Sequence, residues 1–83
     1  MEIWDFYADW CGPCQMMKPI LAEFEKAHSE IKVRAINIDE EGELAAKFGV
    51  SGIPCIVFLK DGKEIDRAVG VTSLRKLEKM AGV

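Results

Sequence analysis

The chain has 83 residues, of which 49% are hydrophobic and 30% are charged, and its formal net charge is −3. A chain of this size forms a single domain, residues 1–83, and buries only about 60–65% of its unfolded surface, so we expect a modest margin of stability. The slightly acidic balance, without a basic stripe interleaved with aromatic residues, argues against nucleic acid as a partner.

The start of the chain and its cysteine count predict a cytoplasmic protein. Residues 1–4 lack the basic start and long apolar run of a signal peptide, and no stretch approaches the roughly 20 apolar residues that span a bilayer. Three cysteines leave one over after any pairing, which fits a reducing compartment better than a secreted domain built on disulfides. We therefore expect no membrane association.

The first half of the chain predicts a strand, a helix and a second strand. Residues 3–8 are apolar and aromatic with a period of two, which indicates a strand. From residue 12 to 27 or 28, apolar residues recur at three- and four-residue spacing, and Pro13 suits the first turn of this helix. Residues 31–38 alternate only loosely, which is typical of a strand covered on both faces.

The second half predicts a short helix, a hairpin and a final helix. Residues 43–48 form the short helix, which Gly49 ends. Two apolar runs, residues 55–59 and 64–69, are joined through Asp61-Gly62, a strong signal for a hairpin. Thr72 or Ser73 caps the last helix, whose buried stripe contains Leu74, Leu77 and Met80 or Ala81. The order is strand, helix, strand, helix, strand, strand, helix, an α/β arrangement that begins with a βαβ unit.

Between the first strand and the first helix lies Trp10-Cys11-Gly12-Pro13-Cys14. A disulfide closing so short a ring contributes only about 2 kcal/mol by the loop-entropy model, against about 3 kcal/mol for a fifteen-residue loop. Chemical reactivity therefore explains the cysteine pair better than stabilisation of the fold by a disulfide. Free N–H groups at a helix start stabilise a thiolate, so Cys11 is the candidate nucleophile, and Cys14, one turn deeper, is the candidate resolving thiol.

At these residues the chain resembles the thioredoxin family, and the resemblance covers nearly all of its length. The segments that carry it are Asp5-Phe6-Tyr7-Ala8-Asp9 before the cysteine motif, Lys18-Pro19, Asn37-Ile38-Asp39, Phe48-Gly49-Val50, Gly52-Ile53-Pro54 and Lys60-Asp61-Gly62. Because the chain begins at the strand leading into the motif, we expect a minimal thioredoxin-like fold without the usual first strand and helix. It would have a four-stranded mixed sheet flanked by three helices.

The resemblance implies roles for individual residues. Asp5 matches the family's buried carboxylate, which would have a raised pKa and exchange a proton with Cys14, although a solvated strand residue is the alternative. Pro54 matches the family's cis-proline facing the cysteines, and the alternative is an ordinary strand start. The groove for an extended substrate would be lined by Trp10, Gly12, Pro13, Ile53, Pro54 and Gly70. Trp10 could instead belong to the core.

Two positions depart from the family, and they leave alternatives open. Ala35 stands where a lysine commonly neighbours the buried aspartate, and Cys55 stands where threonine usually follows the proline. We expect Cys55 to be a small buried hydrophobe, with redox regulation or metal capture as the competing roles. A zinc site would have to recruit Cys55 and His28 beside the motif cysteines, so we expect no metal.

The resemblance predicts an enzyme, a protein-disulfide reductase that cycles between dithiol and disulfide as a monomer without a bound cofactor. Its partners would be substrate proteins with disulfides and an electron donor, either thioredoxin reductase or a glutathione-linked reductase. A glutaredoxin-like reductase is the second interpretation, against which Gly12-Pro13 argues. The third is a module that binds a metal through Cys11, Cys14 and Cys55, or a structural subunit that acts independently of redox state.

Overall fold

A computed structural model describes residues 1–83. Its four strands and three helices follow one another in the predicted order. Their bounds are β1 Glu2–Tyr7, α1 Gly12–Ala27, β2 Lys32–Asn37, α2 Gly42–Lys47, β3 Cys55–Lys60, β4 Lys63–Val69 and α3 Leu74–Ala81. Each lies within one or two residues of the range expected from the sequence. No helix has the length and apolar character needed to cross a membrane.

The four strands form one mixed sheet in the order β2-β1-β3-β4. β1 runs parallel to β2 and antiparallel to β3, and β3 pairs antiparallel with β4. β1 is thus an inner strand, and Asp5 lies between Ala35 of β2 and Ile56 of β3. The α/β fold class with a four-stranded sheet and three helices is confirmed.

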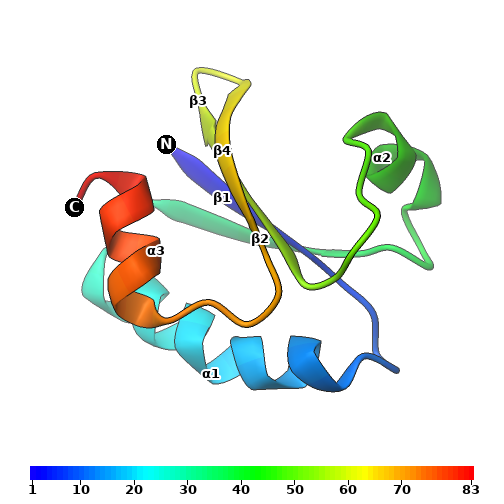
Figure 1. The fold of residues 1–83 in the computed structure, drawn as a ribbon. Helices are drawn as coiled ribbons and strands as arrows, with labels where there is room; N and C mark the ends of the chain where they lie inside the picture. Colours follow the sequence, from blue (N-terminus) through cyan, green and yellow to red (C-terminus); the bar gives the residue numbers. More distant parts are fainter.

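The helices cover both faces of the sheet, with α1 and α3 together on one side and α2 on the other (Figure 1). The core under α1 and α3 is the larger and contains Ile3, Met17, Leu21, Phe24, Ile56, Phe58 and Leu77. The core under α2 contains Phe6, Ile36, Ala45, Cys55, Val57 and Leu59. The period of two in β1 and β3 divides neighbouring residues between these cores.

Local sequence signals place the turns and helix ends. Asp61 and Gly62 have φ values of 53° and 79°, so both central residues of the β3–β4 turn adopt the positive φ that the Asp-Gly pair predicts. Ser73, one of the two expected caps, accepts a hydrogen bond from the backbone N–H of Lys76. α1 continues through Pro19 to Ala27.

The expectation for β2 was wrong in one respect. Its loose alternation predicted a strand covered on both faces, but β2 is an edge strand, and Lys32, Arg34 and Ala35 are exposed. Only Ile36 and Asn37 at its end are buried. The polar residues that blurred the period are typical of an edge strand, where charge opposes further pairing.

Candidate active site

The two motif cysteines lie at the start of α1 and form a disulfide, with their Cα atoms 5.2 Å apart. Cys11 is the N-cap residue, and its Sγ accepts the backbone N–H of Cys14 at 3.2 Å. A sulfur in this position replaces the usual capping oxygen and faces the positive end of the helix. The local structure therefore favours a thiolate at Cys11 once the disulfide is reduced.

The two sulfurs differ in access. Cys11 is 6% exposed, whereas Cys14 is 1% exposed and packs with Ala8 beneath the helix start. Trp10, directly before Cys11, is 70% exposed, so it is not a core residue. A partner approaching from solvent reaches Cys11 before Cys14.

The Ile53-Pro54 segment faces the Cys11 sulfur from the other side. The peptide bond between these residues is cis, as the resemblance implied, and the carbonyl oxygen of Ile53 lies 3.8 Å from Cys11 Sγ. The N–H of Gly70 donates to the carbonyl of Pro54 at 2.8 Å, which places the end of β4 beside this segment. Val69 and Val71, on either side of Gly70, are exposed apolar residues.

Asp5 is buried under α1, as predicted. Its side chain is 4% exposed, and its Oδ1 atom has no hydrogen-bond partner. Burial raises the pKa of this carboxyl from 3.8 to about 6, and the charge of Lys18 acts in the opposite direction. Asp5 also lines a small cavity of about 180 Å³ with Lys18, Glu25 and Ala35. The small side chain of Ala35 leaves β2 without a charged group toward Asp5, so Lys18 of α1 is the nearby cation.

The thioredoxin family model matches residues 2–82 of the chain. A thioredoxin from Chlamydia caviae is 46% identical over 67 residues, which are 81% of this chain and 66% of that protein. One from Alicyclobacillus acidocaldarius is 40% identical over 89% of this chain and 71% of that protein. Mitochondrial thioredoxin 3 of Saccharomyces cerevisiae superposes with a TM-score of 0.90 at 34% identity, covering 98% of this chain and 76% of that structure.

The chain belongs to the thioredoxin family. It spans about two thirds to three quarters of the length of these relatives. Its fold and adjacent cysteine pair are those of a thiol–disulfide oxidoreductase.

Cys55, the cysteine that departs from the thioredoxin pattern, packs in a different cluster from the redox pair. It is 1% exposed and packs in the α2-side core, whereas Cys11 and Cys14 pack in a separate cluster with Ala8. Desolvation is the main cause that raises the pKa of its thiol. The structure contains no group of three histidine, cysteine or acidic side chains arranged to hold a metal. His28 instead contacts Glu78, with Nε2 and Oε2 2.7 Å apart.

One residue at this thioredoxin site had no role in the sequence analysis. Asp39 follows β2, and its Oδ2 accepts the indole N–H of Trp10 at 2.9 Å across 29 positions of sequence. The backbone N–H of Asp39 in turn donates to Oδ1 of Asn37 at 2.9 Å. The Asn37-Ile38-Asp39 segment carries part of the resemblance but indicates no role for Asp39. Nothing local to Asp39 indicates the distant tryptophan.

Proposed function

We propose that the protein reduces disulfides of other proteins, with Cys11 as the attacking thiolate and Cys14 as the resolving thiol. The position of Cys11 carries the proposal, because it combines the helix N-cap with the more exposed of the two sulfurs. The thiolate of Cys11 attacks a substrate sulfur and forms a mixed disulfide, and the first substrate thiolate leaves and takes up a proton. Cys14 then attacks Cys11 Sγ, releases the second substrate thiolate and leaves the Cys11–Cys14 disulfide.

Asp5 would hold or accept the proton that Cys14 exchanges during resolution. Its burial and unpartnered Oδ1 support this role, and a carboxyl that titrates near pH 6 can take up and release a proton close to neutral pH. In the disulfide form Oδ1 of Asp5 has no hydrogen-bond partner. We therefore assign the transfer to the dithiol form or to the mixed disulfide.

The substrate groove would run past the Cys11 sulfur between the helix start and the cis-proline segment. Its members would be Trp10, Gly12, Pro13, Ile53, Pro54 and Gly70, and the 3.8 Å approach of the Ile53 carbonyl to Cys11 Sγ supports its position. The backbone of Ile53 would pair with an extended substrate strand, and the exposed ring of Trp10 would cover one wall. Pro13 would restrict the backbone between the cysteines and so contribute to the reduction potential.

The partners proposed here follow from this chemistry. The disulfide left after each turnover must be reduced by two electrons, which a thioredoxin reductase or a glutathione-linked reductase would supply. We propose a cytoplasmic monomer that works without a cofactor of its own. The assay that separates the donors compares NADPH with thioredoxin reductase against NADPH with glutathione and glutathione reductase.

Alkylation of the reduced protein tests the roles of the cysteines. At a pH near 7, iodoacetamide should modify Cys11 well before Cys14 or Cys55, and mass spectrometry of the peptides measures each rate. Cys14→Ser should accumulate a mixed disulfide with a protein substrate, whereas Cys11→Ser should accumulate little. Equal alkylation rates at all three cysteines would contradict the assignment.

A further inference from the structure

β4 and Gly70, the residue that follows it, approach the segment that leads to the cis-proline at three points. At the start of the segment, a guanidinium nitrogen of Arg67 donates to the carbonyl of Phe48 at 2.7 Å. In the middle, the backbone passes so close that a Cβ atom on Gly52 would lie 3.0 Å from Cγ1 of Val69. At the end, the N–H of Gly70 donates to Pro54. Residues 48–54 therefore follow β4 as far as the redox site.

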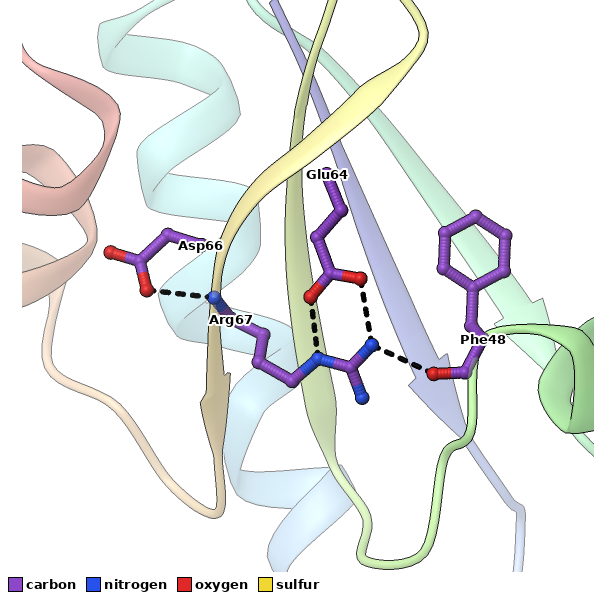
Figure 2. A network of polar contacts seen from close by, with 4 residues as sticks. All are labelled: Phe48, Glu64, Asp66 and Arg67. Atoms are coloured by element: carbon purple, nitrogen blue, oxygen red, sulfur yellow. Dashed lines mark hydrogen bonds and ion pairs between the residues drawn. The ribbon is translucent and has the colours of Figure 1, made fainter.

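A β-bulge brings Glu64 to the side of β4 on which Arg67 lies, so that Glu64 can hold the guanidinium. Residues three apart on a regular strand point to opposite faces, but the β3–β4 register shifts between Phe58 and Leu59, so Glu64 and Arg67 lie on the same face. Nε of Arg67 donates to one carboxylate oxygen of Glu64 at 2.5 Å, and an Nη atom donates to the other at 2.7 Å. Figure 2 shows the guanidinium held by Glu64 while it reaches the Phe48 carbonyl.

Apart from the Arg67 contact, the backbone at the start of this segment makes only local hydrogen bonds, although the side chains of Phe48 and Val50 pack against the α2-side core. α2, which precedes it, has six residues, no side-chain hydrogen bond at its N-cap and one buried residue, Ala45. The N–H groups of Gly49 and Val50 bond back to Ala46 and Ala45 within the same turn. The ring of Phe48 packs against two aromatic rings of β1, but its carbonyl depends on Arg67.

We infer that Arg67 is a positioning residue for the substrate groove, acting by holding the start of residues 48–54 against β4. This inference rests on the proposed function, in which the backbone of Ile53 pairs with the substrate. A backbone that is already fixed binds an extended partner without the entropy cost of being ordered first. Arg67 would therefore affect the binding of protein substrates more than the exchange chemistry at Cys11.

Arg67→Met keeps most of the apolar stem and removes the guanidinium, so it tests the contact directly. We expect KM for a protein disulfide such as insulin to rise about threefold to tenfold, the range that one lost hydrogen bond produces, with little change in kcat. Reduction of a small disulfide, 5,5′-dithiobis(2-nitrobenzoic acid), should stay within about twofold. Amide hydrogen exchange should accelerate in residues 49–53 and not in β1 or α1.

Lys63→Met is the matched control, because it removes a positive charge from an exposed position of the same strand. Its KM for insulin and its amide exchange in residues 49–53 should equal those of the unsubstituted protein. Arg67→Lys keeps the positive charge but loses the bidentate guanidinium, so its KM for insulin and its exchange rates should lie between those of Lys63→Met and Arg67→Met. If Arg67→Met does not fold, Arg67→Lys and Glu64→Gln test the inference instead. Unchanged amide exchange in residues 49–53 together with an unchanged KM in Arg67→Met would overturn the inference. An equal loss of activity toward insulin and toward the small disulfide would also overturn it. If the unsubstituted protein reduces neither disulfide, the proposed function fails, and accelerated exchange still decides whether Arg67 holds the segment.

Discussion

Two segments form the candidate site, and they are held in place in different ways. The segment from Ala8 to Cys14 joins an inner strand to a helix of 16 residues, and its groups are fixed by helix geometry, a disulfide and burial under α1. Residues 48–54 follow a helix of only six residues and are held by contacts from β4. The chemistry thus depends on local structure, whereas the substrate-binding side depends on contacts between residues far apart in the sequence.

The largest effect is expected from Asp5, which lies on β1 just before the first of these segments. Because its folded pKa of about 6 exceeds its unfolded value, the protein loses stability as pH rises from about 4 to about 6, and the loss then remains. Asp5→Asn removes this ionisation. Its free energy of unfolding at pH 7 should exceed that of the unsubstituted protein by roughly 2 to 3 kcal/mol, with little difference at pH 4, and reduction of disulfides should slow.

Urea unfolding at the two pH values measures this difference, and an NMR titration of the Asp5 carboxyl measures its pKa directly. Asp9→Asn, an exposed carboxylate four residues along the chain, is the control and should show neither effect. Ionisation of Asp5 near the reference value of about 3.9 would contradict the burial argument. Restoring the usual lysine, Ala35→Lys, should lower the pKa by placing a second cation beside the carboxyl.

The sequence predicted most of what depends on local signals. The Asp-Gly turn, the Ser73 cap, the helix at the cysteines and the buried position of Asp5 follow from short-range pattern, helped by the resemblance. β2 was misjudged, because its pattern alone does not distinguish an edge strand from an inner one. The link between Asp39 and Trp10 and the Arg67 contacts were not predicted, since each joins residues 19 or more positions apart or depends on a bulge.

A smaller effect is expected when the Trp10 contact is removed. Asp39→Ala deletes the acceptor of the indole N–H and leaves an exposed ring free to change rotamer. We expect KM for insulin to rise about twofold to fivefold, because an exposed hydrogen bond contributes little, while the rate with a small disulfide is unchanged. In an NMR spectrum the indole N–H signal of Trp10 should move and that of Trp4 should not. If Asp9→Ala shifts the same signal equally, a general charge effect replaces the specific contact.

The smallest effect should come from Cys55, which lies beneath the second segment but packs on the α2 side of the sheet. Disulfide exchange needs only Cys11 and Cys14, so Cys55→Thr should preserve turnover within about threefold. Its buried hydroxyl needs a partner, so the free energy of unfolding should fall by about 1 kcal/mol or less. Peptide mapping of air-oxidised protein should find the Cys11–Cys14 bond alone. A dominant disulfide between Cys55 and either motif cysteine would contradict this prediction and give Cys55 a role in redox regulation. Stoichiometric zinc or iron that disappears in Cys55→Thr would contradict it too and make Cys55 a metal ligand.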